Sequence, residues 1–489
     1  MKLKYQRDAF LVFILLAFTY MYFFQDPANN GNSRLALVLS IVQQGRLTID
    51  SFQAIKDLDT GDKSFYNGHY YSDKAIGTSV VGTLFYLPWY WSLKLFRLDF
   101  INHNLGLVKH YLTLCVIGLP SAFAGSLMYV ICKYLSGNRF RAFIATVAIA
   151  LGTMCLPYSI LFYGHQLAAT FLFCGFFLIF QFRILPERRG FINLFLIGLS
   201  LGFALITEYT TAVIILPLLI YFVIVAHKEG LFPSAKSIAF PALGGLIPGA
   251  LLMTYNTLCF GNPFSIGYSF EAKPIFNTAM AQGFMGITVP KLDVLYYITL
   301  HPADGIFWQS PVLLMALVGI YFMLRDKQYR MEAVITLLAL ISYLLLNSGY
   351  YMWWGGYAIG PRLLIPMLPF LSLPLVFVPR RIFFLVIILC IVSIFQMIIV
   401  VASVVQVPED TVMNIKNLSY FQYMPVYSYC MKQLLAGKYG WNLGQRLFGL
   451  KTWKSLLPPV LVIIGGSLMF IPQLARASAS AASRRQAGG

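Results

Sequence analysis

Side chains that could do chemistry are concentrated in one stretch, residues 60–77, with the sequence Thr-Gly-Asp-Lys-Ser-Phe-Tyr-Asn-Gly-His-Tyr-Tyr-Ser-Asp-Lys-Ala-Ile-Gly. It contains Asp62, Lys63, His69, Asp73 and Lys74 in a chain of which only 11% of the residues are charged. A carboxylate beside a cation stays ionised and can act as a base, while the cation can neutralise a phosphate group. Acids and cations in one loop therefore indicate group transfer from a phosphorylated donor.

Three further residues could join this chemistry. His165 stands in Tyr-Gly-His-Gln and Glu208 in the turn Ile-Thr-Glu-Tyr-Thr-Thr, and each pattern is as consistent with a structural polar group as with a site. Arg362 ends the aromatic, glycine-rich stretch 350–362, where a phosphate partner would offset the cost of an unpaired arginine. The candidate site-lining residues are His69, Tyr71, His165, Glu208, Trp354 and Tyr357, with an interfacial anchor as the alternative for the tryptophan.

The composition determines which elements must hold these side chains. The chain has 489 residues, of which 58% are hydrophobic, and a mean hydropathy of +0.72. A soluble domain cannot be this apolar and keep a wettable surface, so we expect a polytopic membrane protein. The net charge of +18 comes from Lys and Arg in short loops, which the positive-inside rule and anionic lipids explain better than nucleic acid does.

A spanning helix needs about 20 apolar residues. This criterion predicts an all-α protein with about twelve transmembrane helices. They are expected at 9–24, 111–130, 142–160, 166–182, 191–206, 210–226, 237–258, 305–324, 333–348, 363–379, 382–405 and 456–474.

The run 77–93 is apolar but short, and it carries Pro88 and the cluster Trp89, Tyr90 and Trp91. If it lies on the surface, the Lys- and Arg-rich loops all fall on the side of the N-terminus. The positive-inside rule then places both termini in the cytoplasm and residues 25–110 outside. We therefore expect 77–93, together with the shorter apolar run 34–42, to form surface helices within a large first outer loop.

The remaining chain adds three outer segments, at 259–304, 349–362 and 406–455. The first has the Gly, Pro and aromatic content of an ordered loop over a cavity. Residues 406–474 are expected to form an outer segment plus the last spanning helix. The tail 475–489, rich in Ala, Ser and Arg, is expected to be disordered.

Three features resemble integral-membrane glycosyltransferases of the GT-C superfamily. The first is an initial helix that leads into a long outer loop with two surface helices. Tyr70-Tyr-Ser-Asp-Lys-Ala-Ile-Gly resembles their Tyr-Phe-Glu-Lys-Pro type element, and Leu119-Pro-Ser-Ala-Phe-Ala-Gly opens the second spanning helix as it does in those enzymes. The likeness is greatest to the branch of bacterial protein O-mannosyltransferases and lipid A aminoarabinose transferases. It extends over residues 1–405, which it identifies as a catalytic transmembrane domain.

The resemblance implies inverting transfer of a sugar from a polyprenyl phosphate donor to a hydroxyl of a glycan, lipid or protein acceptor. An aspartate would take the acceptor proton, with Asp73, Asp50, Asp62 and Asp26 as candidates. Lys74, Arg34 and Arg362 would bind the donor phosphate. The resemblance also implies a bacterial inner membrane, with the site on its periplasmic or extracellular face, and the sequence is compatible with a divalent cation or with none.

One departure from the family pattern concerns the base. Family members place acidic residues shortly before an arginine that opens the surface helix. If Arg34 is that arginine, Gly31 and Asn32 occupy the acidic positions, and neither can act as a base. The base would then be one of the four aspartates named above.

Two other functions are compatible with the sequence. A transporter or flippase of lipid-linked glycans would be expected to show internal repeats or acids in the middle of its helices, and neither is evident here. A glycosyltransferase-like scaffold without activity would explain Gly31 and Asn32. The gathering of polar residues in one outer loop favours the enzyme.

Overall fold

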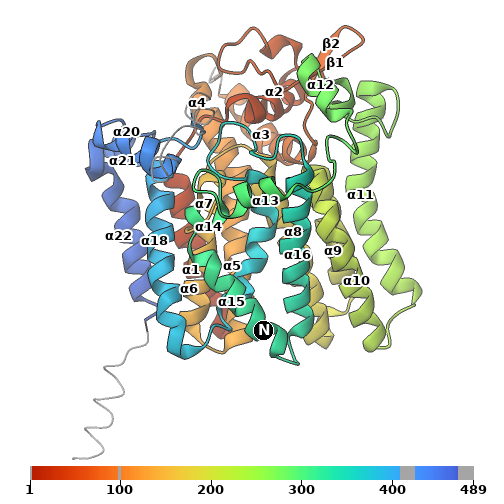
Figure 1. Ribbon diagram of the computed structural model, residues 1–489. Coiled ribbons are helices and arrows are strands. Elements are labelled where there is room, and N and C mark those ends of the chain that lie inside the picture. The colour runs from red at the N-terminus through yellow and green to blue at the C-terminus, as the bar shows by residue number, and fades with distance from the viewer. Residues whose placement is uncertain (1–2, 97–100, 408–423, 472–489) are drawn as a thin grey trace, which may run out of the picture.

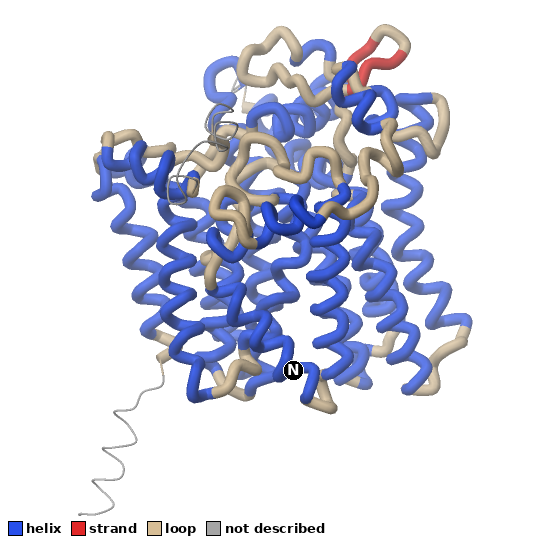
Figure 2. The backbone as a smooth tube through the Cα atoms, viewed as in Figure 1, coloured by secondary structure: helices blue, strands red, loops and turns tan. Residues whose placement is uncertain are grey.

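The computed structural model describes residues 3–96, 101–407 and 424–471, which form a bundle of helices with one small β-hairpin (Figure 1). The long helices lie roughly side by side, and the longest loops gather at the end that carries the hairpin (Figure 2). We call this the loop end of the bundle. Helix α1 (Leu3–Tyr22) begins at the opposite end.

The helices follow one another along almost the whole described chain. After α1 come α2 (Ala28–Gln44), α3 (Gly77–Leu95), α4 (Ile101–Thr113), α5 (Leu119–Ser136), α6 (Arg139–Ala150), α7 (Cys155–Tyr158), α8 (Gly164–Ile184), α9 (Phe191–Thr207), α10 (Ala212–Lys228) and α11 (Ala235–Phe260). The second half contains α12 (Pro274–Met280), α13 (Leu292–Thr299), α14 (Ile306–Gln309), α15 (Val312–Arg325), α16 (Arg330–Gly349), α17 (Ser372–Leu375), α18 (Phe383–Ala402), α20 (Lys432–Leu435), α21 (Leu443–Phe448) and α22 (Leu457–Leu468).

Shorter helical segments connect these elements. The 3₁₀ segments are η1 (Asp50–Phe52), η3 (Pro186–Arg188), η4 (Tyr209–Thr211), η5 (Gly267–Phe270), η6 (Arg362–Leu371), η7 (Arg380–Ile382) and η11 (Thr452–Leu456). Two π-helical segments are η2 (Leu114–Gly118) and η10 (Val426–Met431).

Six described stretches are long and apolar enough to cross a membrane: Asn104–Ser136, Gly164–Ile184, Tyr209–Lys228, Ala235–Phe260, Arg330–Gly349 and Arg380–Ala402. Four further apolar helices are shorter: Phe191–Thr207, Val312–Arg325, Arg362–Leu375 and Thr452–Leu468. Helices satisfy their own backbone hydrogen bonds, which is what a bilayer core requires. The chain is an integral membrane protein, and the predicted all-α polytopic fold is confirmed.

Three of the expected spans are interrupted rather than continuous. In 142–160, α6 ends at Ala150, and the short α7 contains Pro157. In 305–324, the break between α14 and α15 falls at Pro311. In 363–379, two prolines lie within the 3₁₀ segment η6. Proline lacks the N–H that a regular helix needs and its ring clashes with the preceding turn, which favours an interruption at these places.

The first loop contains the two expected helices, with different bounds. Helix α2 is longer than the expected 34–42 because it begins directly after Pro27, where Asp26 Oδ1 accepts a hydrogen bond from Ala28 N at 3.1 Å. It ends at Gly45, whose φ of 65° is left-handed and suits glycine. Helix α3 closely matches the expected 77–93. The two helices pack together, and Ser79 Oγ donates to Arg34 O at 3.0 Å.

The hairpin is fastened to a distant segment. Strand β1 (Ser64–Tyr66) pairs antiparallel with β2 (His69–Tyr71), with Ser64 opposite Tyr71. On its other side, Ser64 bridges to Glu271, and Ala272 N donates to Lys63 O at 2.9 Å. We call residues 263–291 the roof segment; its helix α12 lies beside the hairpin in Figure 1. The first loop and the second outer segment therefore form one layer at the loop end.

Helix α9 is seated closely on α11. An added Cβ at Gly198 would meet the carbonyl of Pro241, and one at Gly244 would meet the carbonyl of Phe195. Small residues let membrane helices approach at backbone distance. This contact fixes α9, which ends next to Glu208, a residue of the site. The expected disordered tail at 475–489 and part of the outer segment 406–455 lie outside the described residues.

Candidate functional site

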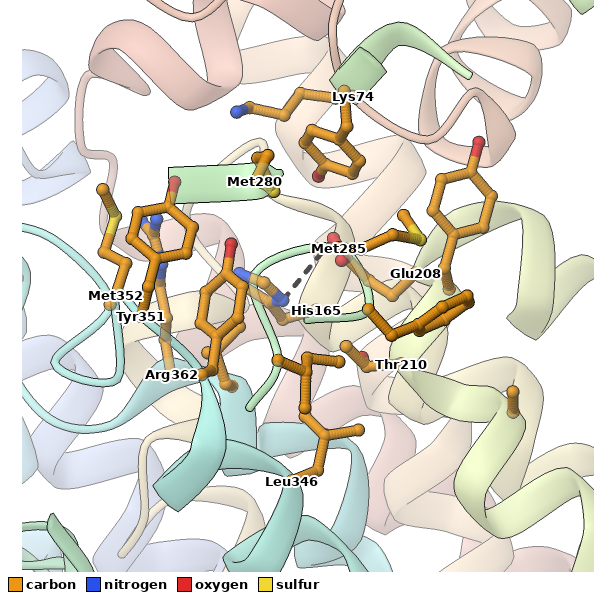
Figure 3. Close-up of a pocket in the computed structure, with 18 of the residues that line it drawn as sticks. Lys74, His165, Glu208, Thr210, Met280, Met285, Leu346, Tyr351, Met352 and Arg362 are labelled. Atoms are coloured by element: carbon orange, nitrogen blue, oxygen red, sulfur yellow. Dashed lines mark ion pairs between the residues drawn. The ribbon is translucent and has the colours of Figure 1, made fainter. Parts of the chain in front are cut away.

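A cavity of about 510 Å³ opens at the loop end of the bundle. Figure 3 shows Lys74 at one end of the cavity and Leu346 at the other, with His165, Glu208 and Arg362 between them. One wall is polar and includes Arg34, Asp62, Asp73, Lys74, His165, Glu208, Glu271 and Arg362. An apolar wall is formed by Ala212 and Val213 of α10 and by Leu345 and Leu346 of α16, while Phe276 and Met280 of α12 line the cavity from the roof segment. The cavity thus suits a ligand with a charged group and a long apolar part.

Lys74 is shared between two carboxylates. Its Nζ lies 2.6 Å from Asp73 Oδ2 and 3.0 Å from Asp62 Oδ2. Burial opposes its charge, but Asp62 and Asp73 raise the pKa of Lys74 well above its usual value. Burial would likewise raise the pKa of Asp62, but Lys74, followed by Arg362, lowers it below its usual value. The charge of the Lys74 ammonium group is already offset by these two carboxylates. The phosphate-binding role expected for Lys74 stays a prediction.

The two aspartates differ in how freely they can act. Asp73 is fully buried, and its Oδ1 accepts a hydrogen bond from Ser33 Oγ at 3.1 Å while its Oδ2 faces Lys74. The Asp62 side chain keeps 20% of its surface exposed, and its ion pair within the described chain is with Lys74. A base must be able to meet the proton that it takes. Asp62 fits that requirement better than Asp73.

Arg34 is held by protein acceptors. Its Nη2 donates to Glu208 Oε1 at 2.8 Å and its Nη1 to Ala75 O at 2.9 Å, and only 1% of its side chain is exposed. These bonds join α2 to the start of α3 and to the turn after α9. Arg34 lines the cavity, as expected of a phosphate ligand, but its geometry is that of a structural clamp.

Glu208 also faces His165. The distance from His165 Nδ1 to Glu208 Oε1 is 3.5 Å, marked in Figure 3, while Nε2 of the imidazole is buried without a hydrogen-bond partner in the described chain. Both residues line the cavity, where the sequence suggested them as site-lining.

Arg362 is the cation of the cavity whose charge is least compensated. It forms no salt bridge with any described carboxylate, and its Nε is buried without a hydrogen-bond partner in the same part of the chain. Its guanidinium lies 5.2 Å from the centre of the Tyr163 ring. Gly355, with a φ of 73°, packs against the arginine side chain, where a Cβ would come within 2.9 Å of Arg362 Cγ. A guanidinium that forms no salt bridge is, in a cavity, a strong site for an anionic ligand.

Glu271 is a site residue that the sequence interpretation did not include. It reaches the cavity from the roof segment, it is only 7% exposed, and its carboxyl lies next to that of Asp73, with which it interacts electrostatically. Burial, followed by the charge of Asp73, raises the pKa of Glu271 to about 9. Glu271 is the only acidic residue between 259 and 292, and this isolation in a glycine- and aromatic-rich loop was the available signal.

Two of the candidate bases lie outside the cavity. Asp26 Oδ2 pairs with Lys109 Nζ at 2.8 Å, and the side chain is 63% exposed. Asp50 pairs with His69 at 2.8 Å on the exposed side of the hairpin. His69, expected to line the site, does not line this cavity, because the hairpin turns its side chain outward and leaves it 57% exposed.

Three aromatic candidates also do not line the cavity. Tyr71 packs its ring against Phe260, 5.4 Å away, beneath the hairpin. Trp354 lies edge-on to Trp353 at 5.7 Å, and Tyr357 is 44% exposed. The same loop places Tyr350 and Tyr351 at the cavity instead, because its glycines turn the chain between these positions and Arg362.

The residues at the family's acidic positions serve packing. A Cβ on Gly31 would collide with Pro27, so no acidic side chain fits there without rearrangement. Asn32 Nδ2 donates to Asp59 O at 3.3 Å and the side chain does not reach the cavity. Among the described residues, no group of three or more His, Cys, Asp or Glu has the geometry of a metal site.

Comparison with known proteins gives a fold. No protein-family model and no curated protein sequence matches the chain. The crystal structure of ArnT from Cupriavidus metallidurans in the apo state is similar with a TM-score of 0.52 and 13% identity, over 94% of this chain and 73% of that one. The structure of the same ArnT bound to undecaprenyl phosphate aligns with a TM-score of 0.44 and 14% identity, over 98% and 71% of the two chains. ArnT is a lipid A aminoarabinose transferase of the GT-C type. The described chain therefore shares the overall fold of ArnT.

Proposed function

We propose that the protein transfers a sugar from a polyprenyl phosphate donor to the hydroxyl of an acceptor. The observation that carries this proposal is Arg362, a partly buried arginine with a buried Nε and no salt bridge to any described carboxylate, in a cavity lined by both polar and apolar side chains. A phosphate attached to a long hydrocarbon supplies both the anion and the apolar part. The fold shared with ArnT, which has been crystallised with undecaprenyl phosphate, supports a donor of this class.

The donor phosphate would lie against Arg362 with Lys74 on its other side. A guanidinium offers paired donors to phosphate oxygens, and an ammonium adds a point charge. The hydrocarbon would follow the apolar wall between α10 and α16, past Val213 and Leu346. Both helices belong to stretches able to span a membrane, so the chain of the lipid would remain in an apolar environment.

Asp62 is the base in this proposal. Its carboxylate would take the proton of the acceptor hydroxyl while the hydroxyl oxygen forms a bond to the anomeric carbon. The bond from that carbon to the phosphate oxygen would break, and the polyprenyl phosphate would leave with the electron pair. Attack opposite the leaving group inverts the anomeric centre. Arg362 would stabilise the charge that develops on the leaving phosphate.

The proposal also includes the membrane in which the protein lies and its orientation there. The loop end would face the periplasm or the cell exterior, both termini would lie in the cytoplasm, and the membrane would be the bacterial inner membrane. The spread of Lys and Arg over the opposite loops supports this orientation.

The test is a transfer assay in liposomes with a polyprenyl phosphate sugar and a mixture of glycan and lipid acceptors. We expect Arg362→Ala to reduce the transfer rate by about 10²-fold or more, because one charge-stabilising donor is lost, and Arg362→Lys to retain part of it. Arg446→Ala is the matched control, since Arg446 lies over Trp441 and does not line the cavity. Movement of the donor across the membrane without covalent transfer would contradict the proposal and favour a flippase.

A further inference from the structure

Glu271 joins two segments of the loop end that lie about 200 residues apart in sequence. The bridge from Glu271 to Ser64 and the hydrogen bond from Ala272 N to Lys63 O fasten the roof segment to the hairpin. Ser64 Oγ adds a bond to Gly267 O at 2.8 Å. The roof segment carries Phe276 and Met280 over the cavity, so the way in which Glu271 is held bears on the shape of the site.

Glu271 lies in a group of side chains that contains more carboxyl groups than cations. Asp62 and Asp73 already share Lys74, at 3.0 and 2.6 Å, and the carboxyl of Glu271 is the third acid in this group. Its Oε2 is buried, and no described group donates a hydrogen bond to it. Two adjacent carboxylates with little solvent repel one another, and a single proton shared between them replaces that repulsion by a hydrogen bond.

The other titratable groups that face Glu271 do not neutralise the negative charge that its carboxylate would carry. They comprise Asp62, Asp73 and Lys74 of the first loop and Tyr351 of the loop before η6. Lys273, two positions along the roof segment, turns toward Gly61 and toward the ring of Phe276. Lys74 is the cation that acts on Glu271, and it is already engaged by both aspartates.

We propose that Glu271 is a positioning residue that holds a proton against Asp73, and that this shared proton keeps the roof segment docked over the cavity and Lys74 paired with Asp62. Glu271 does not itself touch the reacting atoms. The effect of Glu271 on sugar transfer rests on the proposed function. The docking of the roof segment does not.

The sign of the pH dependence follows from the charge of the acid. Burial beside Asp73 raises the pKa of Glu271 from 4.5 to about 9. The docked state therefore binds one proton more than the undocked state between these values. The stability of docking is fully present below the lower value and is lost as the pH rises through about 9.

The docking is measured directly by the distance between two spin labels. Asn67→Cys in the hairpin turn and Ile275→Cys in α12 are both exposed positions, with Cys115 and Cys174 replaced by Ser to limit labelling elsewhere. We expect the distance to be constant from pH 6 to 8 and to broaden toward longer values above pH 9. The same pair with Glu271→Gln should show no change, since the amide stays neutral and can still donate to Asp73.

Two further measurements accompany the distance. Part of the infrared band of protonated carboxyls should be lost between pH 7.5 and pH 10, and this loss should be absent in Glu271→Gln. In the transfer assay, the fall of the wild-type rate above pH 9 should be abolished or weakened in Glu271→Gln. Glu229→Gln is the control, because Glu229 pairs with Arg189 at 2.8 Å and does not line the cavity.

An unchanged label distance in the wild-type protein between pH 7 and 10 would overturn the inference, as would a loss of the carboxyl band above pH 9 that persists unchanged in Glu271→Gln. These two readouts need no transfer activity, so they decide about Glu271 even if the proposed function fails. The label-distance measurement needs only the spin-labelled protein with Glu271 intact. It would therefore still test the proposal if Glu271→Gln folded poorly.

Discussion

Arg34 Nη2 donates to Glu208 Oε1 at 2.8 Å, and the two side chains, 174 positions apart, are 1% and 8% exposed. The pair joins the first helix of the loop end to the turn between two membrane helices, α9 and α10. It thereby fixes the polar wall of the cavity to the bundle.

Breaking this pair should destabilise the protein. Arg34→Ala leaves Glu208 buried without its partner, and loss of one member of a buried pair costs about 3–5 kcal/mol. Thermal unfolding in detergent should show a clearly lowered midpoint. The double variant Arg34→Met, Glu208→Leu should recover part of the loss, because it leaves no unpaired charge. A midpoint unchanged in Arg34→Ala would show that the pair does not hold the two segments together.

Replacement of Asp62 should reduce transfer more than replacement of the other loop aspartates. Asp62→Asn removes the carboxylate that faces the cavity, and loss of a general base lowers the rate by about 10²–10⁴-fold. Asp50→Asn and Asp26→Asn should stay within a few-fold of the wild-type rate because neither residue lines the cavity. Turnover measured at saturating donor separates these effects from binding, and a larger loss in Asp50→Asn than in Asp62→Asn would refute the assignment.

The acid limb of the transfer rate should depend on Lys74. Burial raises and Lys74 lowers the pKa of Asp62, with a net value below 3.8. Asp62 therefore stays ionised as the pH falls to the usual range of carboxyl groups, and the stability from its pairing is present above that range and lost below it. Lys74→Met removes the lowering charge, so the acid limb of kcat/KM should move to higher pH. Lys63→Met is the control, because Lys63 pairs with Asp59 at 3.6 Å outside the cavity.

Bulk added to the apolar wall should act on the donor lipid. Leu346→Trp and Val213→Trp narrow the space between α16 and α10 at the cavity. We expect a raised KM for long-chain polyprenyl phosphate sugars and little change for a short-chain analogue, because only the former needs the wall. Leu338→Trp, on the exposed face of α16 away from the cavity, should behave like the wild-type protein. Equal effects on both donors would place the lipid elsewhere.

Local sequence was sufficient for much of the fold. The apolar runs predicted an all-α membrane protein, since backbone groups in a bilayer must bond within their own helix. The positions of Pro157, Pro311 and Pro366 were visible as well, and they explain why three runs are interrupted. The polar stretch 60–77 already identified Asp62, Asp73 and Lys74, because charge is conspicuous in so apolar a chain.

The tertiary structure decided how these residues are used. It pairs Lys74 with both aspartates, takes up the donors of Arg34 in protein bonds, and leaves Arg362 as the cation without a salt bridge to any described carboxylate. It also brings Glu271 against Asp73 from a segment about 200 residues away. A sequence pattern specifies which elements form, whereas the charge state of a buried group depends on neighbours that only packing brings within a few ångströms.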